Sequence, residues 1–426
     1  MNIEAIYTKF LECNSVITDT RKIEPNNMFF ALKGEKFDAN TFSKEALEKG
    51  AKYVIIDNND YYIDDRTILV PNTLVALQKL ANFHRRTLGT KIIALTGSNG
   101  KTTTKELINC VLSKKFKTTA TVGNLNNHIG VPLTLLSFTK KTEIGIVEMG
   151  ANHKKEIEFL CNIAEPDYGY ITNFGKAHLE GFGGVEGVIE GKSELYKHLE
   201  KEHKEVFVNL DDELKKKKTK NSKRYTFSTD KNSDVIIKDI KANPMVQVNY
   251  KNQTIKSNLI GIYNANNINV AIAIGNFFSI ETNLIKEAIE EYIPTNNRSQ
   301  LINKNNNEII LDAYNANPSS MSAAIQNFIQ LNHTNKTIIF GDMFELGKES
   351  LNEHEKVIET LKEQNNITCY FIGNDFYTNK IEKNNFHFFD TFTSFTNSFT
   401  KQIPENGLIL IKGSRGMALE RVLELL

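Results

Sequence analysis

The sequence contains few cysteines and shows no pairing pattern among them. The four residues, Cys13, Cys110, Cys161 and Cys369, form neither C-x-x-C pairs nor a regular spacing. A disulfide framework or a structural zinc site is therefore not expected, because both need closely or regularly spaced cysteines. We interpret the four as reduced, buried thiols of a cytoplasmic protein.

An excess of charge of either sign and long apolar runs are also missing. With 52 basic and 51 acidic residues, the net charge is +1, which gives no support to a nucleic-acid-binding or membrane-surface protein. The lysine run Lys215–Lys218 fits a solvated helix face or loop better than a binding patch.

No segment approaches the ~20 consecutive apolar residues of a membrane span. The amino-terminal stretch carries Glu4 and Glu12 and has no long apolar core, so a signal peptide is not expected either.

What the chain does contain is a series of short apolar runs with helical stretches between them. This alternation is typical of α/β architecture, and the length of 426 residues predicts two or three domains. We expect buried strands at residues 53–57, 91–96, 144–149, 168–172, 205–210, 308–314, 337–342, 369–373 and 408–413.

Two places in the sequence indicate domain boundaries. A predicted helix ends at Gly89, just ahead of a predicted strand, and a glycine in that position is a typical helix stop. The stretch Ile293–Gln300 is rich in proline and asparagine, which is typical of a turn between elements. We predict domains at residues 1–88, 89–296 and 297–426.

The stretch "ALTGSNGKTTTKELI" combines a predicted strand, a glycine turn and a predicted helix. This order suits phosphate binding, because the unpaired N–H groups and the dipole of the first helical turn face the anion. Gly97 and Gly100 would let the backbone approach phosphates without a Cβ clash. Lys101 would reach the outer phosphates, and Thr102 would offer a hydroxyl to Mg²⁺. The first glycine of the usual P-loop pattern is absent, since Leu95 takes its place, so an ordinary strand-to-helix turn stays open as an alternative.

Three further residues are candidates for a functional site downstream of this loop. Glu148, in "VEMGANHKKEI", falls at the carboxyl end of a predicted strand, where ligands of open α/β sheets bind. His178 and Lys192 lie in "YGYITNFGKAHLEGFGGVEGVIEGKSELY", the first after a strand and a glycine, the second after a glycine-rich turn. Taken singly, each also fits a structural role: a capping or salt-bridged glutamate, a structural histidine and an exposed lysine.

Together these segments resemble the Mur ligases, the ATP-dependent amide-forming enzymes of bacterial cell-wall precursor synthesis. The family's loop is the short form T-G-S-x-G-K-T-T that stands here, so the missing glycine is no objection. The other matching motifs are "GNLNNHIGVPLTLL", "EMGAN", "DAYNANPSSM", "GDMFELG" and "KGSRGMALE". The resemblance covers essentially the whole chain. It is greatest to the branch that adds D-alanyl-D-alanine to a UDP-muramoyl tripeptide, because "YNANP" replaces the D-N-P-R motif of the branch that adds diaminopimelate or lysine.

The resemblance implies a fold, a reaction and partners. The fold would be α/β in three domains: a small mixed α/β UDP-binding domain, a central P-loop ATPase domain with a mainly parallel sheet, and a C-terminal Rossmann-like domain. The reaction would use ATP to convert the terminal carboxylate of UDP-N-acetylmuramoyl-tripeptide into an acyl phosphate, which the amine of D-alanyl-D-alanine then attacks. No nucleophilic side chain is needed for this chemistry. A cytoplasmic monomer that binds no nucleic acid is expected.

The resemblance also implies roles for individual residues. The residues implied to bind ATP are Gly97, Ser98, Asn99, Gly100, Lys101, Thr102, Thr103, Asn267, Arg298 and Asp312. Two Mg²⁺ sites are implied, with ligands among Thr102, Glu148, His178 and Lys192, where Lys192 would be carried as an anionic carbamate. The residues implied to be catalytic are Lys101, Glu148, His178 and Lys192. Substrate contacts are implied for Thr20, Arg21, Asn126, Asn127, Asn315, Asn317, Lys412, Ser414 and Arg415.

Two segments differ from the family pattern or allow another interpretation. "SVITDTRKIEPNNMFFALKGEKFDAN" resembles the UDP-holding segment, with Thr20 where serine is common. We interpret it as two short strands with a turn at Gly34, offering a hydroxyl, Arg21 and backbone donors to a diphosphate; a plain β-hairpin edge is the alternative. Tyr263 stands where the family usually has histidine, so roles for Asn264 and Asn267 are better supported than one for Tyr263.

Three other functions remain as alternatives at this point. A Mur ligase that adds a different amino acid is the nearest. A folylpolyglutamate synthase is less favoured, because those relatives lack a UDP-sugar domain. A nucleotide-binding regulator without ligase activity would keep the P-loop, but it would have little use for Glu148, His178 and Lys192 together.

Overall fold

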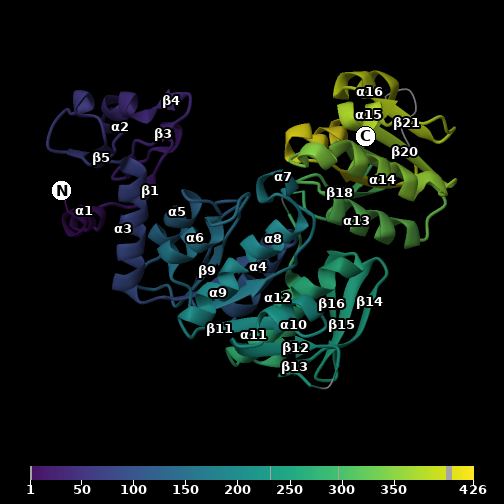
Figure 1. Cartoon of the computed structure of the whole chain (residues 1–426), viewed down its shortest axis with the longest axis horizontal. Helices are drawn as coiled ribbons and strands as arrows, with labels where there is room; N and C mark the ends of the chain where they lie inside the picture. The colour runs from purple at the N-terminus through teal and green to yellow at the C-terminus, as the bar shows by residue number, and fades with distance from the viewer. Residues whose placement is uncertain (1, 231, 296, 400–404) are drawn as a thin grey trace.

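The computed structural model describes residues 2–230, 232–295, 297–399 and 405–426. Three domains follow one another along the chain: the first lies at the left of Figure 1, the second in the middle and the third at the upper right. Each domain has its own sheet with helices around it. The three-domain α/β architecture predicted from the sequence is therefore confirmed.

The amino-terminal domain is built around a small parallel sheet with the order β1-β2-β5-β6. Its main elements are α1 (Ile3–Phe10), β1 (Val16–Ile17), β2 (Met28–Phe30), β3 (Lys33–Gly34), β4 (Phe37–Asp38), α2 (Ser43–Glu48), β5 (Tyr53–Ile56), β6 (Thr67–Leu69) and α3 (Thr73–Leu88). The short strands β3 and β4 pair antiparallel, as the predicted hairpin requires. Gly34 is the last residue of β3, however, so the turn lies one step later, at residues 35–36.

The central domain holds a seven-stranded, fully parallel sheet with the order β13-β12-β11-β10-β7-β9-β8. Its strands are β7 (Lys91–Thr96), β8 (Thr118–Ala120), β9 (Ile144–Glu148), β10 (Tyr168–Ile171), β11 (Glu205–Asn209), β12 (Lys223–Ser228) and β13 (Val235–Ile236). The helices between them are α4 (Lys101–Ser113), α5 (Gly130–Leu136), α6 (Glu156–Ala164), α7 (Leu179–Phe182), α8 (Val185–Lys192), α9 (Glu194–Lys201) and α10 (Glu213–Lys218). Because all strands run in the same direction, their carboxyl ends meet at one edge of the sheet.

A second, antiparallel sheet completes the central domain. It consists of β14 (Lys238–Ala242), β15 (Met245–Tyr250) and β16 (Gln253–Ile260), and it is followed by α11 (Ala265–Phe277) and α12 (Thr282–Glu291). Helix α11 is apolar on nearly all sides and buried over most of its length, as expected for a helix enclosed by other elements. Its side chains share one apolar cluster with both sheets.

The C-terminal domain contains a six-stranded sheet with the order β17-β18-β22-β19-β20-β21. Its elements are β17 (Gln300–Lys304), β18 (Asn307–Asp312), α13 (Pro318–Gln330), β19 (Lys336–Gly341), α14 (Ser350–Lys362), β20 (Ile367–Ile372), α15 (Asn374–Thr378), β21 (Phe386–Phe389), α16 (Phe392–Phe399) and β22 (Leu408–Lys412). Only β17 pairs antiparallel; the other strand pairs are parallel. Helices on both sides of a mostly parallel sheet match the predicted Rossmann-like arrangement.

The strands predicted from the sequence are all present, with ends shifted by no more than two residues. Helix α3 ends at Leu88, and Gly89 follows with a φ of 65°, a left-handed conformation that glycine adopts readily. The second predicted domain boundary falls on residue 296, which lies outside the described residues. In the part of the chain that the structure describes, no helix combines the length and apolar character needed to cross a membrane.

Two sequence interpretations need correction. Cys161 and Cys369 are buried free thiols, but the other two free cysteines, Cys13 and Cys110, are only partly buried. The predicted solvated lysine run is wrong for Lys215, which is 1% exposed, although the three lysines after it are exposed. The Lys215 ammonium donates to the Thr172 carbonyl at 2.6 Å, and this partner offsets part of the cost of burying a charge.

The Asp167 carboxylate is one of the groups that join helix α3 to the central domain. Asp167, at the start of β10, accepts hydrogen bonds from Lys204 at 2.8 Å, from the Ile92 amide at 3.1 Å and from Arg85 of α3 at 3.3 Å. Lys91 adds a fourth contact at 3.5 Å. In Figure 1, α3 is the long helix between the amino-terminal and central domains. Asp167 thus fastens the end of this helix to the base of the central sheet.

Candidate active site

A cavity of about 910 Å³ lies between the central domain and the C-terminal domain. Residues at the carboxyl ends of β7, β9 and β10 line it, which is where open parallel sheets bind their ligands. The predicted site residues that line the cavity are Ser98, Asn99, Gly100, Lys101, Thr102, Thr103, Asn126, Asn127, Glu148, His178, Asn267, Arg298, Asp312, Asn315, Asn317 and Lys412. Residues on both sides of the predicted boundary between the central and C-terminal domains thus line the same cavity.

The loop between β7 and α4 needs its two glycines for space as well as for backbone shape. Gly97 has a φ of 142°, and a Cβ there would lie 1.9 Å from Thr172 Oγ1. Gly100 has a φ of 78°, and a Cβ there would lie 2.7 Å from Asn267 Oδ1. A side chain at either position would collide with a neighbour in addition to straining the backbone. Asn267 therefore packs directly against the loop, where its own Oδ1 accepts from Thr104 Oγ1 at 2.9 Å.

The same loop is fixed by hydrogen bonds to the segment that follows β10. Ser98 Oγ donates to the Gly175 carbonyl at 2.7 Å, and the Asn99 amide donates to Asn173 Oδ1 at 3.1 Å. In return, Thr172 Oγ1 and Asn173 Nδ2 donate to the Asn99 carbonyl at 2.6 and 3.1 Å. These bonds hold the backbone of the loop in one shape before any anion contacts it, which lowers the ordering cost of binding.

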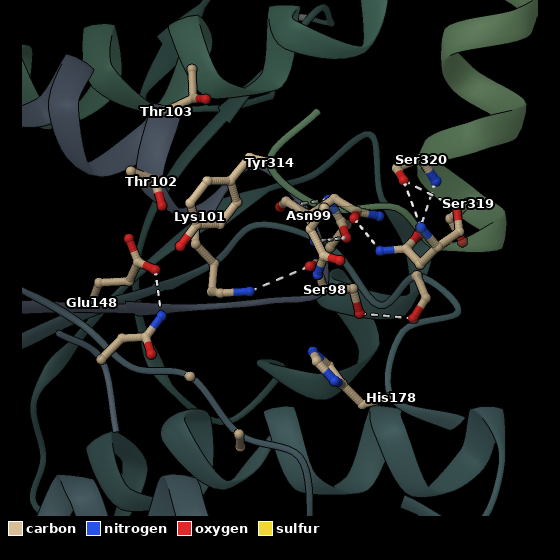
Figure 2. Close-up of a pocket in the computed structure, with 18 of the residues that line it drawn as sticks. Ser98, Asn99, Lys101, Thr102, Thr103, Glu148, His178, Tyr314, Ser319 and Ser320 are labelled. Carbon is tan, nitrogen blue, oxygen red and sulfur yellow. Dashed lines mark hydrogen bonds between the residues drawn. The ribbon is translucent and has the colours of Figure 1, made fainter. Parts of the chain in front are cut away.

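Lys101 is the first residue of α4, and its side chain folds back over the loop (Figure 2). Its ammonium donates to the Gly97 carbonyl at 2.8 Å and to the Ser98 carbonyl at 3.3 Å. Burial lowers the pKa of Lys101, and the nearby charge of Arg298 adds to that effect, while the charge of Glu148 opposes it. Two cations that face the same space favour an anionic ligand between them.

Glu148, the last residue of β9, is 1% exposed. Its Oε1 accepts from Asn126 Nδ2 at 2.8 Å, and its amide donates to Thr121 Oγ1 at 2.9 Å. Its Oε2 is buried and has no hydrogen-bond partner among the described residues. A buried carboxylate oxygen without a partner is costly, and a cation close to the loop and to Thr102 would satisfy it.

His178 lies across the cavity from the loop (Figure 2), just before α7 and with a left-handed φ of 54°. Its Nδ1 lies against the carboxylate of Glu345, a residue of the C-terminal domain. The two groups form an ion pair when the imidazole is protonated, and this contact lowers the pKa of Glu345. An ion pair between Lys176 and Glu353, at 3.1 Å, also joins the segment around His178 to the C-terminal domain.

Lys192, at the end of α8, lies behind the cavity wall rather than in it. Its side chain is 1% exposed, its ammonium donates to the Ala151 carbonyl at 2.9 Å, and it lies 5.0 Å from the centre of the Phe182 ring. Burial and then the charge of Lys101 lower the pKa of Lys192 well below its usual range. Such a lysine is neutral more readily than an exposed one and can act as a nucleophile.

The C-terminal domain supplies a buried ion pair and a stacked arginine. Asp312 accepts from Lys412 at 2.6 Å and from the Ser299 amide at 3.1 Å. The guanidinium carbon of Arg298 lies 3.5 Å from the centre of the Tyr314 ring. The predicted nucleotide residue Asp312 and the predicted substrate residue Lys412 are therefore partners of each other.

Some predicted residues do not line this cavity. They are Gly97, Lys192, Thr20, Arg21, Ser414 and Arg415. Thr20 and Arg21 belong to the amino-terminal domain, where Arg21 pairs with Asp19 at 2.8 Å. Ser414 is buried and accepts from the Phe344 amide at 2.9 Å, and Arg415 pairs with Glu420 at 2.7 Å.

The structure also shows site residues that were not singled out from the sequence. Asn173 braces the loop, Tyr314 stacks on Arg298, and Ser319 Oγ accepts from the Lys176 amide at 2.7 Å. Asn173 lies in the stretch that was quoted for His178 and Lys192, and Tyr314 and Ser319 lie in the family motif "DAYNANPSSM". The motifs thus marked the right segments, but residue spacing alone gives no sign of which side chains meet across the cavity.

Three regions of the chain match Mur ligase models: residues 12–85 match the catalytic domain of the Mur ligase family, 95–275 the Mur ligase middle domain and 297–415 the glutamate ligase domain. A curated relative, the UDP-N-acetylmuramoyl-tripeptide–D-alanyl-D-alanine ligase of Bacillus subtilis, is 34% identical over 96% of this chain and 92% of its own.

Solved structures agree with this similarity. The crystal structure of MurF from Acinetobacter baumannii has a TM-score of 0.86 and 30% identity, covering 99% of this chain and 97% of its own. The MurF ligase from Thermotoga maritima, solved in complex with ADP, has a TM-score of 0.84 and 27% identity, covering 98% and 97%. The chain, with its short phosphate loop and three matched regions, belongs to the Mur ligase family.

Proposed function

We propose that the protein is an ATP-dependent ligase that joins D-alanyl-D-alanine to UDP-N-acetylmuramoyl-tripeptide. The products would be UDP-N-acetylmuramoyl-pentapeptide, ADP and phosphate, in peptidoglycan synthesis. The observation that carries the proposal is the similarity over nearly the full length of both chains to a ligase with this name. The phosphate loop and the residues around it, which lie together in one cavity, support it independently.

The nucleotide would bind at the loop between β7 and α4. Residues 98–103, which include the start of α4, line the cavity, and helix starts of this kind bind phosphates. Lys101 would exchange its carbonyl partners for phosphate oxygens, and Arg298 would approach from the other domain. Asn267, packed against Gly100, would fix the loop, and Asp312 would act through its ion pair with Lys412.

The residues present fit a magnesium ion next to the loop. Thr102 offers a hydroxyl, and Glu148 offers a buried carboxylate oxygen without a protein partner in the described chain. No group of three or more histidine, cysteine or acidic side chains among the described residues forms a complete metal cage. Magnesium typically needs no such cage of protein side chains, because it binds one or two carboxylates together with substrate phosphates and water. When bound, the ion would neutralise the charge of the triphosphate.

For the second magnesium site we propose His178 and a carbamate of Lys192. The buried, readily neutral amine of Lys192 can attack carbon dioxide, forming an N–C bond and losing one proton to give an anionic carbamate. The carbamate would convert a cation behind the cavity wall into an oxygen ligand. His178 lines the cavity, just before α7.

The reaction would then proceed by positioning and charge neutralisation. The terminal carboxylate of the tripeptide attacks the γ-phosphate of ATP, releasing ADP and leaving an acyl phosphate. The dipeptide amine attacks the acyl carbon, and the tetrahedral adduct collapses with loss of phosphate and a proton. Lys101 and the loop amides would hold the phosphoryl oxygens throughout, where fixed donors stabilise developing charge most effectively.

The remaining predicted residues would hold the substrates. Thr20 and Arg21 in the amino-terminal domain would contact the UDP part. The residues proposed to contact the peptide parts are Asn126, Asn127, Asn315, Asn317, Lys412, Ser414 and Arg415. We further propose domain limits at residues 1–88, 89–296 and 297–426, a monomer, and a place in the cytoplasm, where ATP and nucleotide-linked precursors are available.

Mass spectrometry of the product tests the central proposal. The protein is incubated with ATP, Mg²⁺, UDP-N-acetylmuramoyl-tripeptide and D-alanyl-D-alanine. A mass gain equal to the dipeptide less one water is expected, with one phosphate released per bond. Single amino acids offered in place of the dipeptide test the nearest alternative, a Mur ligase that adds a different amino acid. Faster phosphate release with one of them would overturn the dipeptide assignment while leaving the family unaffected.

A further inference from the structure

The closest cation–ring contact of the cavity joins Arg298 to Tyr314. The guanidinium carbon lies 3.5 Å from the ring centre, a stacking distance at which a cation and an aromatic face attract each other. Both residues line the cavity, as does Lys101 of the phosphate loop. The contact is therefore part of the site that faces the phosphate loop.

The ring takes the place that a carboxylate usually has beside an arginine. Asp312 is near in the chain, but its two oxygens accept from Lys412 and from the Ser299 amide. Arg298 Nε is buried and has no hydrogen-bond partner among the residues that the structure describes. Stacking covers only the face of the guanidinium, so it leaves the N–H groups along its edge available to an anion.

The backbone supports this arrangement. The Tyr314 amide donates to the carbonyl of Asn297 at 3.2 Å, so the segment that carries the ring is tied to the residue before Arg298. A second guanidinium, that of Arg415, lies 6.0 Å from the same ring centre, but it is already paired with Glu420. The ring therefore acts mainly on Arg298.

We propose that Tyr314 is a positioning residue, which holds the Arg298 guanidinium flat so that its N–H edge points at the phosphoryl oxygens bound by the loop. This inference rests on the proposed function. The role belongs to the face of the ring and not to the hydroxyl. Arg298 and Lys101 then approach the same anion from two domains, which agrees with the influence of the Arg298 charge on Lys101.

The test replaces the ring and measures nucleotide binding apart from ligation. Tyr314→Leu removes the ring, Tyr314→Met fills similar space without one, and Tyr314→Phe keeps the face. Tyr377→Leu is the matched control, because Tyr377 also has a lysine over its ring, at 4.5 Å, but does not line the cavity. Calorimetric titration with a non-hydrolysable ATP analogue and Mg²⁺ gives the affinity, and steady-state assays give kcat and KM.

Loss of a partly desolvated cation–ring contact should weaken analogue binding or kcat/KM by about 3- to 30-fold in the leucine and methionine variants. The phenylalanine variant should recover most of the loss. In an Arg298→Met background, Tyr314→Leu should add less than about twofold, because the group it positions is gone. Equal impairment by phenylalanine and leucine, or an undiminished effect in the Arg298→Met background, would overturn the inference.

The two readouts separate this inference from the proposed function. If the wild-type protein binds the analogue but ligates no dipeptide, the proposed reaction fails while the titration still decides the role of Tyr314. If ligation proceeds and neither the titration nor kcat/KM differs between Tyr314→Met and wild type, the inference alone fails. Thermal unfolding of each variant confirms that the compared proteins are folded.

Discussion

Asn317 of the C-terminal domain donates a hydrogen bond from its Nδ2 to Oδ1 of Asn99 in the phosphate loop, at 2.7 Å. The same Asn317 side chain caps α13, since its Oδ1 accepts from the Ser320 amide at 3.0 Å. The Asn99 backbone is in turn held by Thr172 and Asn173. The start of a helix in the third domain is thus connected directly to the loop proposed to bind ATP.

Asn317→Ser should weaken ATP binding without unfolding α13. Serine caps a helix about as well as asparagine, but it is too short to reach Asn99. Loss of one neutral hydrogen bond should raise KM for ATP by about two- to tenfold. Ser320→Ala is the control, because it removes the other half of the capping box and leaves Asn99 untouched. Equal KM values for Asn317→Ser and wild type would mean that the contact does not support the loop.

Glu148→Gln should reduce ligation strongly with little change in stability. Glutamine keeps the oxygen that accepts from Asn126 but removes the negative charge proposed to bind Mg²⁺. We expect kcat to fall by about 10²- to 10³-fold, with saturation shifted to higher Mg²⁺ concentration. Glu158→Gln, on the exposed face of α6, should behave as wild type. An unchanged magnesium dependence of Glu148→Gln would argue against this ligand.

Lys192→Ala should abolish ligation, and short added carboxylates should restore part of it. The reason is that formate or acetate can place an oxygen ligand where the carbamate is proposed to lie. The exposed Lys197 on α9 gives the control variant Lys197→Ala, which should neither lose activity nor respond to the added acids. A mass increase of one carbon dioxide on the intact wild-type chain, preserved by trapping, measures the modification directly. Full activity of Lys192→Ala would contradict the proposal.

Asp167→Asn should destabilise the protein near neutral pH and less so in acid. Burial raises the pKa of Asp167, but the hydrogen bonds from Lys204 and the Ile92 amide, with the charge of Arg85, outweigh it, so the pKa lies below its ordinary value. A carboxylate with a lowered folded-state pKa contributes stability above its unfolded pKa of about 4, and that stability is lost as the pH falls through the folded pKa.

We expect a loss of about 2–4 kcal/mol in the free energy of unfolding at pH 7, below the upper range for breaking a buried pair because two of the partner lysines are partly exposed. Denaturant unfolding at pH 7 and at about pH 3 measures the difference between Asp167→Asn and wild type. Asp60→Asn, at an exposed position, is the control. A difference that stays constant between the two pH values would contradict the electrostatic explanation.

The fold was largely predictable because its signals are local. Apolar runs such as Ile92–Leu95 mark buried strands, and Gly89 ends a helix by its own conformational preference. The phosphate loop was predictable for the same reason, since strand, turn and helix start lie within one short stretch. These features depend on neighbours in the sequence, which the sequence shows directly.

Contacts between distant segments were not predictable in the same way. Lys215 belongs to a run that looks solvated, yet it is buried against the Thr172 carbonyl because α10 packs beside the carboxyl ends of the strands. The stacking of Arg298 on Tyr314 likewise depends on how the chain returns to the cavity. Side chains of opposite domains meet through packing, which the periodicity of either segment does not encode.

The back-folded side chain of Lys101 also bears on which anions the loop can select. Two of its three N–H donors already serve the carbonyls of Gly97 and Ser98. A monovalent anion with one or two oxygens gains too little from the third donor to displace these partners. A polyphosphate chain, which engages the lysine and the loop amides together, can compete. The loop should therefore favour polyphosphate chains over small monovalent anions.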